Sequence, residues 1–167
     1  MFIVFEGLDR SGKSSQSKLL AEFLGAELMC FPNRQNCESG KLLDLYLKNK
    51  DINMGNEAVH LLFAMNRWET RTQIIEKLQN GVSVVCDRYA YSGVAYSAAK
   101  GLDFDWCLGA DRGLLRPDLV FFIDISPEAI SQRSGFGDER FERVDFQAKV
   151  DQTFSKFKAE GCSDAEY

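Results

Sequence analysis

The stretch Gly7-Leu8-Asp9-Arg10-Ser11-Gly12-Lys13-Ser14 decides the fold of this chain. It fits the pattern GxxxxGK[ST] at every defined position. An apolar run at 2–5 precedes it, and a helical pattern follows from Gly12 to Leu24, where Gly25 ends it. A strand before the loop and a helix after it are the context that this pattern requires. We therefore interpret residues 7–14 as a loop that holds the phosphates of a nucleoside triphosphate.

The chemistry of this loop follows from its residue types. Glycines let the backbone curl so that N–H groups point at phosphate oxygens, and the helix N-terminus adds partial positive charge there. Lys13 can reach the terminal phosphates, and the Ser14 hydroxyl can ligate Mg²⁺. Such a loop indicates only triphosphate binding, so the rest of the chain must separate a kinase from a GTPase or an ATPase.

The remaining residues alternate between strand-like and helix-like patterns, which predicts an α/β domain with a mainly parallel sheet of four strands. We expect a single domain over 1–157 and a flexible tail over 158–167. The predicted strands are 2–5, 26–31, 82–86 and 119–125, of which the first and last are expected to be buried. The predicted helices are 12–24, a short one capped by Ser39, 56–79, one after Asp103, one opened by Ser126-Pro127-Glu128, and 146–157. The expected apolar face of the first helix is Leu19, Leu20, Phe23 and Leu24.

Composition and charge narrow the classes of function. The chain has 167 residues, of which 45% are apolar, and a net charge of −5. These values favour a folded domain and argue against a protein that coats nucleic acid. The first residues show no basic region ahead of an apolar stretch, so we expect no secretory signal. No apolar run approaches the roughly 20 residues needed to span a bilayer. We therefore expect no nucleic-acid or membrane partner, and a protein of the cytosol, or of the nucleus if it diffuses there.

Two other classes of nucleotide-binding protein fit the sequence poorly. A GTPase carries a guanine reader of the type NKxD after a later strand. The nearest counterpart here is Asn49-Lys50-Asp51, where the acid comes one residue early and no strand precedes it. The chain is also too short for a motor or transporter ATPase with coupling elements. The sequence therefore favours transfer of a phosphoryl group to a small acceptor.

Three arginines indicate where that acceptor binds. Arg34 and Arg88 follow predicted strands, and Arg67 lies in the long predicted helix. Ligands of open α/β sheets bind beyond the carboxyl ends of the strands, so Arg34 and Arg88 should reach that edge. The planar guanidinium grips a phosphate through two parallel hydrogen bonds, which suits an acceptor monophosphate.

These residues lie in stretches that resemble thymidylate kinase of the eukaryotic type. The stretches are FEGLDRSGKSSQ at 5–16, FPNR at 31–34, LLFAMNRWE at 61–69, DRYAYSGVAYSAAKG at 87–101, RPDLVFFIDISPE at 116–128 and GFGDERFE at 135–142. The resemblance extends from Phe2 to about Phe157. It implies the P-loop nucleoside monophosphate kinase fold and transfer of a phosphoryl group from ATP, with Mg²⁺, to dTMP in the synthesis of dTTP.

The resemblance also implies which residues bind dTMP. Arg34 and Arg88 would hold its phosphate, Phe63 would stack on thymine, and Arg67 would donate a hydrogen bond to a base carbonyl. Asp9 would accept from the 3′-hydroxyl of the sugar. The full expected set is Asp9, Phe31, Arg34, Phe63, Arg67, Arg88, Ser92, Tyr96, which would disfavour a ribose at C2′, and Phe141, which stands where many relatives have tyrosine.

The triphosphate side is implied in the same way. Arg10 would neutralise charge at the transferring phosphoryl group, and Asp87 would work near Mg²⁺ or position the acceptor. The expected catalytic residues are Arg10, Lys13, Asp87 and Arg88, and the expected metal ligands are Ser14 and Asp87. The residues expected at the ATP phosphates are Gly7, Asp9, Arg10, Ser11, Gly12, Lys13, Ser14, Ser15 and Arg133.

A lid and the end of the chain complete the expectations. Two glycines break a helical pattern near 133–142, which predicts a mobile lid that excludes water during transfer. Ser134 to Glu139 contain no arginine or lysine, which favours the family type with its catalytic arginine in the P-loop. The family adds a fifth strand and a closing helix after the lid, and no strand-like run follows Phe157.

The sequence leaves two alternative functions open. One is a broader deoxynucleoside monophosphate kinase with dUMP as a second acceptor, and another is a nucleotide-binding protein without catalysis. The helix at 56–79 would form a homodimer if the outer face of that helix packs on a twofold partner, as in the family.

Overall fold

The sheet has four parallel strands and carries the site at one end. The computed structural model describes residues 1–133, 137 and 139–160. In these residues the strands are β1 (Phe2–Gly7), β2 (Glu27–Cys30), β3 (Val84–Asp87) and β4 (Leu119–Ile123). Their order is β2-β3-β1-β4, and every pairing is parallel. The predicted α/β fold with a four-stranded parallel sheet is therefore confirmed.

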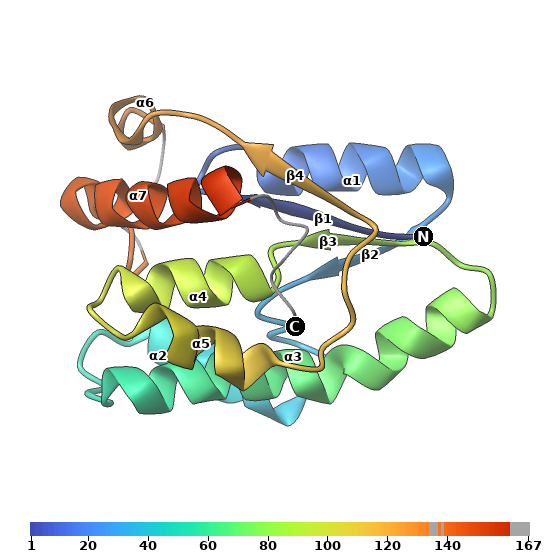
Figure 1. Cartoon of the computed structure of the whole chain (residues 1–167), viewed down its shortest axis with the longest axis horizontal. Helices are drawn as coiled ribbons and strands as arrows, with labels where there is room; N and C mark the ends of the chain where they lie inside the picture. Colours follow the sequence, from blue (N-terminus) through green and yellow to red (C-terminus); the bar gives the residue numbers. More distant parts are fainter. Residues whose placement is uncertain (134–136, 138, 161–167) are drawn as a thin grey trace.

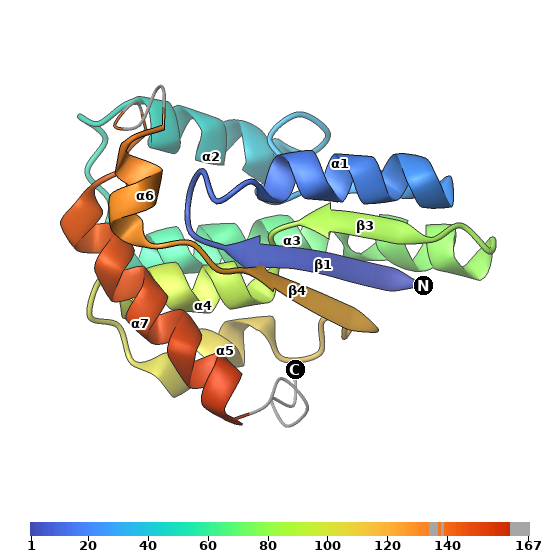
Figure 2. The same cartoon turned by 90° about the horizontal axis from the view of Figure 1, so that it is seen from above.

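Helices cover both faces of this sheet. They are α1 (Lys13–Leu24), α2 (Glu38–Lys48), α3 (Asn56–Gln79), α4 (Ala90–Ala98), α5 (Phe104–Asp111), α6 (Pro127–Ser131) and α7 (Val144–Glu160). Figure 1 shows α1 on one face and α3, α4 and α5 on the other. In Figure 2, α6 and α7 lie beyond the ends of the β1 and β4 arrows, near the loop that joins β1 to α1. Every predicted helix is present, although the bounds of several differ.

The strand register brings the functional loops to one edge. Phe5 pairs with Asp87 at the end of β3, and Gly7 pairs with Ile123 at the end of β4, so β1 and β4 end together and β3 ends two residues earlier at the same edge. All six residues of β1 are buried, because β1 has a strand on each side and helices on both faces. The loop after β1 and the turn after β3 therefore meet at the carboxyl edge of the sheet, where α/β proteins bind ligands.

The predicted apolar face of α1 is wrong except at Leu20, which is partly buried against the sheet. Leu19 and Phe23 are 59% and 86% exposed, whereas Ser17 and Ala21 are buried against the sheet. The phosphate-binding loop fixes the rotation of the helix, because it turns Lys13 inward. Positions four and eight residues later then face the strands. Their small side chains let the helix lie close to β1 and β3.

Strand β4 is not the buried strand that its apolar sequence predicted. Leu119 and Phe121 are 48% and 42% exposed. Among the described strands, β4 pairs with β1 alone and forms an edge of the sheet. An apolar run cannot by itself distinguish an edge strand from a central one.

Other helix boundaries also differ from the predictions. Helix α4 was not predicted, because its small residues are buried nearly all round and show no clear apolar stripe. Cys37, not Ser39, is the N-cap of α2, and the Ser39 hydroxyl donates to Glu69 instead. Helix α7 begins two residues before the predicted start and continues to Glu160. Residues 161–167 of the expected tail lie outside the described residues.

No helix among the described residues combines the length and the apolar character needed to cross a bilayer.

Candidate active site

The loop between β1 and α1 adopts a conformation that needs its glycines. Gly7 and Gly12 have φ values of 140° and 105°, and Arg10 has a φ of 56°. A Cβ on Gly7 would lie 2.6 Å from the carbonyl oxygen of Ile123, so only glycine fits there. The loop thus holds an unusual non-glycine residue, Arg10, in the left-handed region, as functional sites often do.

Lys13 lies inside the loop. Its amine donates to the carbonyl oxygen of Leu8 and to the Ser11 hydroxyl, 3.2 Å away. Burial and the positive charge of Arg88 lower the pKa of Lys13 to about 7. A bound triphosphate would supply the negative charge that this buried amine lacks, and would raise its pKa again.

A candidate metal site lies between α1 and β3. The Ser14 hydroxyl donates to Asp87 Oδ2 over 2.5 Å, and the buried Asp87 Oδ1 has no hydrogen-bond partner among the described residues. A serine hydroxyl and a carboxylate with a free oxygen match the oxygen ligands that Mg²⁺ takes beside a nucleotide phosphate. The two residues expected to ligate the metal are therefore brought together with a chemically suitable donor set.

Arg88 is the centre of a second cluster, at the start of α4. It has a φ of 69°, and its Nη1 donates to the carbonyl of Gly7 and to the Ser92 hydroxyl, both at 3.0 Å. Its Nη2 contacts Asp9 Oδ1 at 2.5 Å. Glu6 completes the cluster, because its buried carboxylate accepts from the backbone N–H groups of Tyr89 and Ser92. Burial raises the pKa of Glu6 in spite of these donors.

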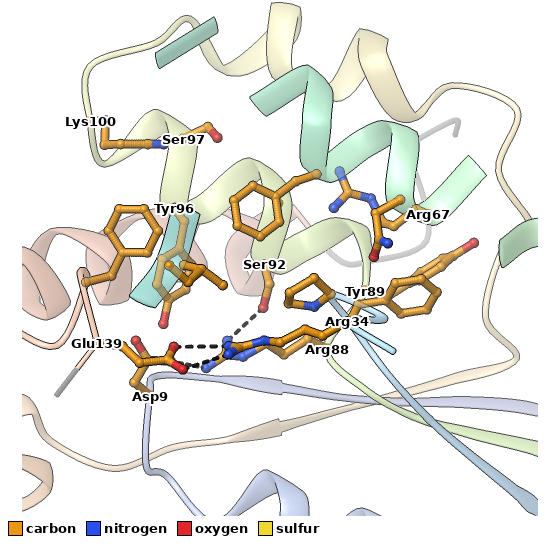
Figure 3. Close-up of a pocket in the computed structure, with 17 residues that line it drawn as sticks. Asp9, Arg34, Arg67, Arg88, Tyr89, Ser92, Tyr96, Ser97, Lys100 and Glu139 are labelled. Atoms are coloured by element: carbon orange, nitrogen blue, oxygen red, sulfur yellow. Dashed lines mark hydrogen bonds and ion pairs between the residues drawn. The ribbon is translucent and has the colours of Figure 1, made fainter. Parts of the chain in front are cut away.

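Arg34 lies beside this cluster and contacts the lid segment. Its guanidinium donates to both carboxylate oxygens of Glu139, at 2.8 and 3.1 Å, and to Asp44 at 3.3 Å. The hydrogen bond to Glu139 is the main cause of the raised pKa of Arg34. Dashed lines in Figure 3 join Arg34 to Glu139 and Arg88 to Asp9.

A pocket extends away from these arginines, with about 670 Å³ of empty space when the open solvent at its mouth is included. Residues of α3 and α4 form much of its wall, and the Phe31-Pro32 turn and the lid segment close its sides. The expected dTMP residues all line it, namely Asp9, Phe31, Arg34, Phe63, Arg67, Arg88, Ser92, Tyr96 and Phe141. It therefore has cations at one end and aromatic rings along its walls, which fits a small phosphate ester with a planar base.

The far end of the pocket contains a buried ion pair. Arg67 donates through Nε and Nη2 to the two oxygens of Asp111, at 2.8 and 2.7 Å, and the side chains are 2% and 0% exposed. Gly93 on α4 leaves room for this pair, because a Cβ there would lie 2.5 Å from Arg67 Nη2. The pair fixes the guanidinium so that it faces the pocket as a donor.

The described part of the predicted lid contacts the phosphate-binding loop. Arg10 Nε donates to Glu142 Oε1 over 2.8 Å, and Arg133 donates to the carbonyl of Arg10. Gln147 on α7 accepts from the Asp9 N–H at 3.0 Å and donates to the Asp9 carboxylate at 2.8 Å. Of the predicted lid, residues 134–136 and 138 lie outside the described residues. The described lid residues thus reach the loop that would hold the triphosphate.

The structure brings the predicted residues into two adjoining groups. One group is the phosphate-binding loop, with Arg133 and Asp87, and the other is the pocket that would hold the acceptor. Ser15 is exposed in the first turn of α1. The sequence analysis missed the residues that hold these groups in place, which are Glu6, His60, Asp111, Glu139 and Gln147. Only Glu6 gave a signal, as a charged residue that ends an apolar strand. The others act through partners that are distant in the sequence.

The fold and the site define a class of protein. A parallel sheet, a phosphate-binding loop and an arginine-lined acceptor pocket beside it together describe a P-loop nucleoside monophosphate kinase. The family model described as thymidylate kinase matches residues 5–163, and the chain belongs to that family.

Individual relatives agree with this assignment. A thymidylate kinase of Arabidopsis thaliana is 48% identical over 98% of this chain, which spans 65% of that protein. A thymidylate kinase of Schizosaccharomyces pombe is 47% identical over 95% of this chain, which spans 77% of that protein. The solved structure of a thymidylate kinase from Candida albicans superposes with a TM-score of 0.88 at 44% identity, covering 93% of this chain and 76% of that one.

Proposed function

We propose that the chain transfers the γ-phosphoryl group of ATP to dTMP, giving ADP and dTDP. The observation that carries this proposal is that Asp9 connects the phosphate-binding loop to the acceptor pocket. Asp9 belongs to the phosphate-binding loop, lines the acceptor pocket and contacts Arg88 at 2.5 Å. A triphosphate on the loop and a monophosphate at Arg34 and Arg88 would therefore lie next to each other. Such proximity contributes most of the catalysis in phosphoryl transfer.

Each residue of the site has a role in this mechanism. Lys13 and Arg10 neutralise the charge that builds up on the transferring group, and Arg88 and Arg34 hold the acceptor phosphate. The acceptor oxygen is already ionised at neutral pH, so no strong general base is needed. Ser14 and Asp87 would hold Mg²⁺, which supplies further charge neutralisation between the phosphates when it is bound.

An ADP-release assay tests the function. We expect turnover with ATP and Mg²⁺ to depend on dTMP and to exceed that with dCMP, dGMP or AMP. Comparable turnover with dUMP would show the broader deoxynucleoside kinase, for which the pocket offers no separate observation. Binding of ATP and dTMP without any acceptor-dependent turnover would overturn the catalytic proposal and leave a binding protein.

Glu139 competes with the acceptor for Arg34, which leads to a prediction. Glu139→Gln should tighten dTMP binding about twofold to fivefold, since it removes a charge that occupies the guanidinium in a partly exposed pair. Titration calorimetry would measure the change. Asp44→Asn is the comparison, because Asp44 contacts the same guanidinium through one longer hydrogen bond of 3.3 Å, so this variant should tighten binding less. Weaker binding in Glu139→Gln would mean that Glu139 supports the site and does not compete with dTMP.

We also propose that the chain forms a homodimer through α3. Leu61, Met65 and Trp68 are exposed at positions i, i+4 and i+7 of that helix and form one apolar stripe. Met65→Asp should convert the dimer to a monomer in sedimentation experiments, because a charge would be buried at the centre of the contact. Leu45→Asp, at an exposed apolar position of α2, should leave the dimer intact. A wild-type monomer would rule the proposal out.

A further inference from the structure

His60 is the only histidine of the chain and lies fully buried on α3, behind the wall of the acceptor pocket. Its two ring nitrogens contact α4 and α5. Nδ1 lies 2.8 Å from the Ser97 hydroxyl, and Nε2 lies 3.0 Å from the carbonyl oxygen of Cys107. Ser97 lines the pocket. A buried histidine often serves only to satisfy polar groups in a core, but this one holds a hydroxyl that faces the ligand site.

The partners of His60 determine the direction of both hydrogen bonds. A backbone carbonyl can only accept, so Nε2 carries the proton. Burial and the nearby Arg67 lower the pKa of His60, which keeps the ring neutral. Nδ1 therefore carries a lone pair, and the Ser97 hydroxyl must donate its single proton to it. Toward a ligand in the pocket that Ser97 lines, the hydroxyl oxygen can then only accept.

Arg67 lines the same pocket, and its clamped guanidinium can only donate. In Figure 3 both residues lie above Asp9 and Glu139, with Ser97 beside Lys100 and Arg67 on the opposite side of the view. A pocket wall that offers one acceptor and one donor suits a base edge on which a ring N–H stands next to a carbonyl. Thymine and uracil present that edge. Cytosine presents a ring nitrogen lone pair and an amino group, so its polarity is opposite at both positions.

We propose that His60 is a positioning residue that fixes Ser97 as an acceptor and so selects thymine-type bases over cytosine. The inference rests on the proposed function, because it takes the acceptor to be a nucleotide whose base enters this pocket. His60 does not touch the base, and it acts by removing the freedom of the Ser97 hydroxyl to turn and donate. A site that leaves buried polar groups facing like partners discriminates strongly between substrates.

A pair of ligands isolates this effect. 5-Methyl-dCMP differs from dTMP only in the polarity of the base edge, so the ratio of the two dissociation constants measures the selection. His60→Leu frees the Ser97 hydroxyl and should lower this ratio about tenfold or more, partly by improving the binding of 5-methyl-dCMP. Ser97→Ala should also lower the ratio. The double variant should show no further loss, because His60 acts only through Ser97.

Two controls separate this role from a structural one. Ile74→Ala removes a buried side chain of α3 that does not line the pocket, so it should reduce stability without changing the ratio. The second is the nitrogen NMR spectrum of the single histidine in the wild-type protein, which needs no variant to fold. It should report a neutral ring with the proton on Nε2.

The outcomes distinguish the inference from the proposed function. A proton on Nδ1, a charged ring, or an unchanged ratio in His60→Leu would overturn the inference while dTMP turnover still stood. A wild-type protein that binds both nucleotides equally would also overturn it. Selective binding of dTMP without turnover would support the inference and remove the catalytic proposal alone.

Discussion

Replacing Arg10 with alanine should lower the turnover number about 10³-fold or more, the range found when a charge-neutralising arginine is lost from phosphoryl transfer. The dissociation constant for dTMP should stay within about threefold of the wild type, because Arg10 does not line the acceptor pocket. The guanidinium belongs to the phosphate-binding loop and contacts Glu142 over 2.8 Å. This position fits the proposed role of Arg10 at the transferring group. Steady-state kinetics with calorimetric binding would measure both quantities.

The backbone at Arg10 requires its own control. Its φ of 56° lies in the left-handed region, where alanine is strained but asparagine is tolerated. Arg10→Asn should therefore lose as much turnover as Arg10→Ala if the guanidinium is what matters. Near-normal turnover in Arg10→Asn would assign the alanine defect to the loop conformation. Wild-type turnover in both variants would exclude Arg10 from catalysis.

Asp111→Ala should cost about 3–5 kcal/mol of stability, which is typical when one partner of a buried ion pair is removed. Arg67 would then be an uncompensated charge in the protein interior, with its side chain 2% exposed. The free energy of unfolding, from denaturant titration, measures this loss. Discrimination between dTMP and dCMP should fall as well, because the guanidinium would no longer be held toward the base.

The double variant Arg67→Met, Asp111→Leu provides the matched comparison. Replacing both charges with apolar side chains should be far less costly than Asp111→Ala alone, since no buried charge is left without a partner. It should nevertheless lose base discrimination. If the double variant were as unstable as the single one, packing around Asp111, and not charge, would explain the loss.

The fold was largely predictable from local patterns. The phosphate-binding loop, the strand before it and the long helix α3 were all placed correctly, because each is specified by neighbouring residues. The orientation of α1 was not. Leu19 and Phe23 suggested an apolar face, but the inward turn of Lys13 sets the rotation of the helix. A rotation that the loop fixes cannot be read from the periodicity of the helix itself.

In the candidate site, too, some residues could be predicted from local sequence and others could not. The residues expected to contact substrates came from motifs and from the family resemblance, and the structure gathers them around one pocket and one loop. The residues that support them could not be found in this way. Asp111 lies 44 positions from Arg67, and Gln147 lies 138 positions from Asp9. Each becomes visible only when the chain has brought its partner close, and none lies in a recognisable pattern.

The charge balance of the site has a consequence for its behaviour among other anions. Arg10, Arg34 and Arg88 each contact a carboxylate of the protein, which is Glu142, Glu139 and Asp9 respectively. An incoming anion must therefore exchange with a charge already in place, and does not simply add to a positive surface. Inorganic phosphate can only replace a protein carboxylate at an arginine, whereas a nucleotide also gains binding energy from the stacking of its base. The protein should therefore tolerate high cellular phosphate without becoming blocked, and raised ionic strength should weaken nucleotide binding little.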